Sequence, residues 1–225
     1  MWSARLQLRT RLAPCPTAGE FPQPGSVLWL RLSGTEGWLD PLRMELEAEG
    51  RLWTPRFQIR PVGAATDRGN PWAHRPDDYA PLRWGHLEDD TRTLREAPGR
   101  PDDLVGLVID RILEGLGSQP ARTLLRQAAG LLPEDAPWLL CERNGASVFE
   151  VVRNLRRDEG QRGEGRGTVR TAQELRRLLE SAGLGVGQAW GLAPSGGARL
   201  RGRVPGGAGW PRLFLEGRRV VPVGE

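Results

Sequence analysis

The spacing of apolar residues changes along the chain, and this change limits the folds that the sequence can adopt. Residues 2–12 and 42–48 alternate apolar and polar positions, and residues 26–32 form a nearly continuous apolar run, both typical of β-strands. After residue 101 the apolar residues recur every three or four positions, which is the period of a helix that packs on a core. The sequence therefore predicts an α+β fold.

Three segments follow from this pattern. Residues 1–62 are predicted to form an antiparallel β-unit, in which a turn at Glu49-Gly50 joins strands 42–48 and 52–59 as a hairpin. Residues 63–101 are rich in Gly, Pro, Asp, Arg and Trp without a clear period, and are predicted to be an irregular connector. Residues 102–225 are predicted to form an α/β unit with a Gly- and Arg-rich tail.

Within the α/β unit, two helices are predicted over residues 120–131 and 171–182. The second has a capping box at Thr171 and Glu174 and ends at Gly183. Residues 138–142 read as a buried strand, whereas residues 104–109 fit either a buried strand or the start of a helix. Short strands are predicted around 198–204 and 212–223.

Composition excludes several classes of protein. No apolar run approaches the roughly 20 residues of a membrane-spanning helix, so we expect a soluble, cytoplasmic protein with no membrane contact. Two cysteines, Cys15 and Cys141, exclude a disulfide scaffold. His74 and His86 match no zinc-ligand spacing, and there is no Gly-x-Ser-x-Gly motif. We therefore predict no metal site.

All 32 basic residues are arginines, and they are unevenly distributed. Residues 60–110 carry seven Arg against ten Asp or Glu, a net charge of −3, and residues 160–225 carry eleven Arg against five Glu, a net charge of +6. Alternating arginines with a nearby aromatic ring can bind nucleic acid, or can simply form a basic edge strand. The candidate nucleic-acid-binding residues are Arg199, Arg201, Arg203, Trp210, Arg212, Arg218 and Arg219. Because Trp and Arg are enriched at interface hot spots, we also expect a protein partner or an oligomer.

Between residues 103 and 195 a series of short motifs carries a family resemblance. In order, they are Asp103-Leu104-Val105, Arg111-Ile112-Leu113, residues 121–130, Leu131-Leu132-Pro133, residues 139–143, Arg170-Thr171, Glu174-Leu175, Leu178-Leu179 and residues 181–184. This order resembles the C-terminal half of small-molecule O-methyltransferases that use S-adenosylmethionine. The resemblance implies a methyltransferase-like α/β unit.

The resemblance also implies site features that this chain lacks. No counterpart of the family's Gly-rich cofactor loop is found upstream of Asp103, no acidic residue can be placed on the ribose, and Glu114 stands where the general-base His would fall. We therefore predict a non-catalytic binding or assembly subunit with a degenerate methyltransferase-like domain and no cofactor. The alternatives are Arg-mediated nucleic-acid binding, and S-adenosylmethionine-dependent methyl transfer with Glu114 as the candidate catalytic base.

Overall fold

The chain builds one mixed sheet with helices on both of its faces. The computed structural model describes residues 15–31, 38–55, 94–95, 97, 99–147, 169–194, 200–205 and 212–221. Its main elements are β1 (Ser26–Arg31), α1 (Asp40–Ala48), β2 (Leu52–Trp53), β3 (Leu104–Asp110), α2 (Ser118–Leu131), β4 (Pro137–Arg143), α4 (Ala172–Glu180), β5 (Leu184–Pro194), β6 (Leu200–Pro205) and β7 (Arg212–Arg219). None of the helices in these ranges is long and apolar enough to cross a membrane.

The seven strands have the order β2-β1-β3-β4-β7-β5-β6. The first four are parallel, whereas β7 runs antiparallel between β4 and β5, and β6 pairs antiparallel with β5. From β1 the chain passes to β2 on one side, and β3 later takes the place on the other side of β1. This reversal is a topological switch point, and ligands of open α/β sheets bind at the carboxyl ends of the strands there.

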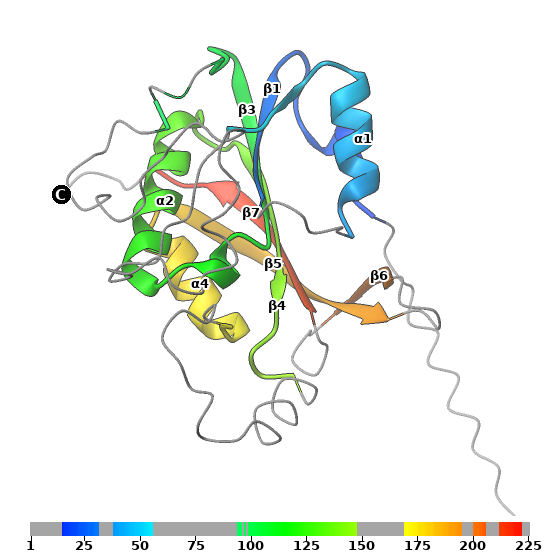
Figure 1. Ribbon diagram of the computed structural model, residues 1–225, viewed down its shortest axis with the longest axis vertical. Helices are drawn as coiled ribbons and strands as arrows, with labels where there is room; N and C mark the ends of the chain where they lie inside the picture. The colour runs from blue at the N-terminus through cyan, green and yellow to red at the C-terminus, as the bar shows by residue number, and fades with distance from the viewer. Residues whose placement is uncertain are drawn as a thin grey trace, which may run out of the picture.

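Two apolar layers cover the sheet. Figure 1 shows α2 and α4 on one face and α1 on the other. The buried side chains divide in the same way: Leu28 of β1 belongs to the cluster that includes Leu124 of α2, and Trp29 belongs to the cluster that includes Leu42 and Leu46 of α1. Because both faces of β1 are buried, its sequence is a continuous apolar run without alternation.

Most of the predictions for residues 102–225 are confirmed. The helices predicted over 120–131 and 171–182 are α2 and α4, and the strand over 138–142 is β4. The capping box of α4 is formed, since the Thr171 hydroxyl accepts from Glu174 N at 3.3 Å and the Glu174 carboxylate accepts from Thr171 N at 2.7 Å. Residues 104–109 take the strand alternative. The tail strands are β6 and β7, and β5 was not predicted.

The prediction for residues 42–48 is wrong, because these residues form helix α1 and no hairpin. Leu42 and Leu46 are buried, but Met44 between them is 63% exposed, so the inward period is four residues. Pro41 lies in the first turn, where its missing N–H has no helical partner to lose.

The pairing of the N-terminal strands is corrected as well. Both β1 and β2 join the same sheet as β3 in parallel, in place of a separate antiparallel unit. The predicted strand at 2–12 and the end of the predicted strand at 52–59 lie outside the described residues. The division of the chain at residues 62 and 101 stays a prediction.

Gly217 in β7 is expected to be indispensable for close packing of the sheet. A Cβ at this position would meet the Gly185 carbonyl oxygen and, at 2.7 Å, Cζ2 of the fully buried Trp138. We expect Gly217→Ala to lower the free energy of unfolding by about 1–3 kcal/mol. In the control, Gly187→Ala, the nearest atom would be the Glu216 carbonyl oxygen at 3.4 Å, and the change should stay within about 0.5 kcal/mol. Urea denaturation of both variants measures the difference, and equal losses would contradict this packing.

Candidate functional site

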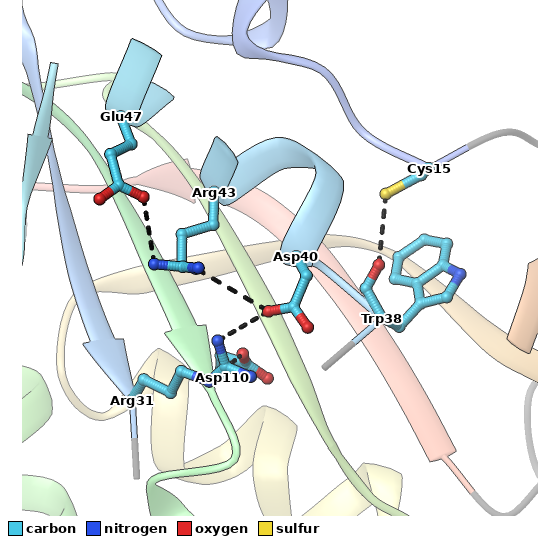
Figure 2. A network of polar contacts seen from close by, with 7 residues as sticks. All are labelled: Cys15, Arg31, Trp38, Asp40, Arg43, Glu47 and Asp110. Carbon is cyan, nitrogen blue, oxygen red and sulfur yellow. Dashed lines mark hydrogen bonds and ion pairs between the residues drawn. The ribbon is translucent and has the colours of Figure 1, made fainter. Parts of the chain in front are cut away.

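Three charged residues meet at the switch point of the sheet. Arg31 is the last residue of β1, Asp110 is the last residue of β3, and Asp40 is the first residue of α1. The register of the parallel pair places Arg31 directly beside Asp110. Figure 2 shows the end of the Arg31 side chain beside both Asp40 and Asp110. We call Arg31, Asp40 and Asp110 the edge cluster.

The edge cluster is held by ion pairs and is largely buried. Arg31 Nη1 lies 2.7 Å from Asp40 Oδ1, and Arg31 Nε lies 3.3 Å from Asp110 Oδ2. The side chain of Arg31 is 15% exposed, that of Asp40 is 30% exposed, and that of Asp110 is completely buried. The more exposed Arg43 lies on the outer side of the cluster, with Nε 3.9 Å from Asp40 Oδ1.

Asp110 has an unusual environment for a carboxylate. Burial raises its pKa to about 6, although the charge of Arg31 acts in the opposite direction. Among the described residues, none donates a hydrogen bond to either carboxylate oxygen of Asp110. A buried carboxylate without hydrogen bonds is rare in folded proteins, and its presence here marks the switch point as a candidate binding site.

The candidate base Glu114 belongs to a second polar group at the ends of β3 and β4. Its Oε1 accepts a hydrogen bond from Arg143 N at 3.2 Å and lies 3.4 Å from Arg111 Nε. Its Oε2 lies 3.0 Å from Arg143 Nε. Both carboxylate oxygens are therefore engaged within the protein, whereas a general base must reach the proton that it removes from a substrate.

Glu142 and Arg170 anchor the short 3-10 helix that contains Glu114 (η3, Leu113–Gly115). The fully buried Glu142 accepts from Leu113 N at 2.8 Å, and Arg170 donates to the carbonyl oxygens of Leu113 and Leu116, both at 2.6 Å. Burial raises the pKa of Glu142 well above its usual value, and burial lowers the pKa of Arg170. The segment after β3 is therefore fixed in place by β4 and by the residue before α4's N-cap.

The arginines predicted to bind nucleic acid do not gather at one place within the described residues. Arg212 begins β7 and lies next to the carboxyl end of β4 in the sheet. Arg218 and Arg219 lie at the other end of β7. Arg218 donates to the Asp135 carbonyl oxygen at 3.0 Å, and Arg219 donates to the Leu132 carbonyl oxygen. The backbone of Arg201 and Arg203 lies in β6, and Arg199 and Trp210 lie outside the described residues. Nucleic-acid binding stays a prediction.

Comparison with known proteins identifies the type of fold. The sequence matches no protein-family model and no curated protein. A SAM-dependent methyltransferase from Methanosarcina mazei is 11% identical, and the match covers 93% of this chain and 100% of that chain at a TM-score of 0.51. An O-methyltransferase family protein from Burkholderia thailandensis is 17% identical, and the match covers 88% of this chain and 52% of that chain at a TM-score of 0.46. Human N-acetylserotonin methyltransferase in complex with SAM is 15% identical, and the match covers 89% of this chain and 48% of that chain at a TM-score of 0.40. This chain therefore spans about half the length of the last two proteins.

The chain therefore has the fold of SAM-dependent methyltransferases, as the resemblance implies.

Sequence reasoning missed the edge cluster. A signal was present, since Arg31 and Asp110 are the charged residues that end the apolar runs 26–30 and 104–109. Charged residues at the carboxyl ends of parallel strands are candidates for ligand contacts.

The raised pKa of Asp110 predicts a specific pH dependence of stability. Because the native state keeps this proton up to about pH 6 and the unfolded chain loses it near 3.8, Asp110 makes the fold less stable as pH rises through this window. The total effect is about 3 kcal/mol, and Asp110→Asn removes it. We therefore expect the stability of the wild type relative to this variant to fall by about that amount between pH 4 and pH 7. Urea denaturation at each pH measures it, and parallel curves for the two proteins would contradict the assignment.

Proposed function

We propose that this chain is a non-catalytic binding or assembly subunit, which uses a methyltransferase-like domain without transferring methyl groups. The observation that carries the proposal is the position of Arg31 across the carboxyl ends of β1 and β3. In open α/β sheets a ligand at the switch point needs the backbone after the first strand to approach closely, which small residues allow. Here the residue that ends β1 is a large, ion-paired arginine, largely buried.

The charge of Arg31 at the switch point argues against S-adenosylmethionine at this place. The cofactor would supply a methyl group on a positively charged sulfur. In this chain a positive guanidinium already lies between the carboxylates of Asp40 and Asp110, at ion-pair distance from both. A second positive group in the same place would be repelled by Arg31 at close range.

The arrangement of Glu114 supports the same proposal. Methyl transfer to a hydroxyl group requires a group that accepts the hydroxyl proton. Glu114 directs both oxygens to Arg111, Arg143 and the Arg143 amide, so it takes part in the structure of the segment after β3. The partner that we propose for this subunit is a protein or a second copy of the chain, in keeping with its many Trp and Arg residues.

Cofactor binding tests this proposal directly. We expect the wild type to give no binding heat and no shift of its thermal midpoint with about 1 mM S-adenosylhomocysteine, whereas a ligand at 100 times its Kd would stabilise it by about 2.7 kcal/mol. Arg31→Gly removes the side chain that fills the switch point, so this variant should bind more tightly than the wild type. Arg43→Ala is the control, because Arg43 lies near Asp40 but outside the switch point. A clear shift of the wild type would overturn the proposal.

A further inference from the structure

We propose that the edge cluster is a receptor for a small planar organic cation with guanidinium or amidinium N–H groups, and that Arg31 is the intramolecular competitor that occupies it. The inference goes beyond the proposed function, because it assigns a small ligand to the carboxyl edge of β1 and β3 in addition to the proposed protein partner.

The chemistry of the receptor follows from the group that lies in it. Asp40 and Asp110 come from different elements, α1 and β3, and both lie within ion-pair distance of one guanidinium group. A guanidinium is planar and carries N–H donors on several sides, so it matches two carboxylates that face it from different directions. The two aspartates therefore define a place for a positive charge with at least two N–H donors (Figure 2).

Arg31 fills this place only in part. It donates a hydrogen bond to Asp40 at 2.7 Å, but its Nε approaches Asp110 at 3.3 Å without the geometry of a hydrogen bond. Asp110 is completely buried, and a carboxylate in that position normally accepts hydrogen bonds. A ligand that donates to both aspartates would make the hydrogen bonds that Arg31 does not make.

The surrounding charges favour a cation once Arg31 is displaced. Burial raises the pKa of Asp110, and among the neighbouring charges Arg31 opposes this effect most strongly, ahead of Arg111 and Arg212. Arg111 is itself paired with Glu114. Arg31 is therefore the main charge that keeps Asp110 ionised, and an external cation that replaces Arg31 would stabilise the ionised Asp110 in the same way. Asp40 is 30% exposed, which gives this side of the cluster contact with solvent.

Chemical rescue of an Arg31 variant tests the inference. Methylguanidinium chloride is added to the full-length Arg31→Ala protein at up to about 10 mM, and binding is followed by the thermal midpoint and by calorimetry, with sodium chloride at equal concentration as the reference. We expect the midpoint of Arg31→Ala to rise with concentration. The wild type should bind at least about tenfold more weakly, because its Arg31 must first leave the receptor.

Two variants make the test specific. Arg43→Ala removes an arginine that also lies beside Asp40 but pairs mainly with Glu47, so it should respond to methylguanidinium as the wild type does. Adding Asp110→Asn to Arg31→Ala removes the buried charge, so this double variant should lose the response. If Arg31→Ala alone is unfolded, methylguanidinium should restore its folding.

The inference is overturned if Arg31→Ala responds no more than Arg43→Ala, if the double variant responds as strongly as Arg31→Ala, or if an unfolded Arg31→Ala is not rescued. Its failure is distinct from failure of the proposed function. Binding of S-adenosylhomocysteine by the wild type would overturn the proposed function, whereas the methylguanidinium response depends only on the two aspartates and the absence of the Arg31 side chain.

Discussion

The parallel pairing of β1 with β3 is the constraint on which the rest of the structure depends. It joins residues that are 77 positions apart, as the hydrogen bond between Ser26 and Asp103 at its start shows. Its register sends Leu28 and Trp29 to opposite faces, where α2 and α1 cover them. A slip of one residue would exchange these faces, so burial on both sides fixes the register. The same register brings Arg31 beside Asp110, and the position of the candidate site follows from the core.

The sequence was sufficient for elements that local signals define. The capping box at Thr171 and the four-residue spacing of Leu175 and Leu179 identify α4, and both are local. The pattern of Leu42, Met44 and Leu46 was ambiguous, because alternate residues include a pair at i and i+4. The exposed side chain of Met44 fits a helix and not a strand with one buried face. Which side chains are exposed depends on packing with distant strands, so this signal was not in the local sequence. The parallel order could not be predicted, because the partner of β1 is separated from it by a long stretch of sequence.

The candidate site was predicted in one part and missed in another. Glu114 was chosen because a resemblance placed it where a base would fall, but its contacts with Arg143 became visible only when β3 and β4 lay side by side. Arg31 and Asp110 end apolar runs, so each could be noted as a charged strand end. Their meeting required the strand order, which no local pattern contains. Sequence motifs therefore identified the class of fold better than the arrangement of charges on it.

Asp110 in the edge cluster does not add to the stability of the sheet at neutral pH. The two apolar layers bury the large side chains, whereas an ionised Asp110 destabilises the fold at neutral pH because burial raises its pKa to about 6. Buried ion pairs are in general weak sources of stability, since desolvation of both charges offsets their attraction. A buried carboxylate that opposes folding when ionised, placed at the switch point where this type of sheet binds ligands, is typical of a site organised for binding. In this chain the charge at that point is an arginine held by two aspartates from different elements.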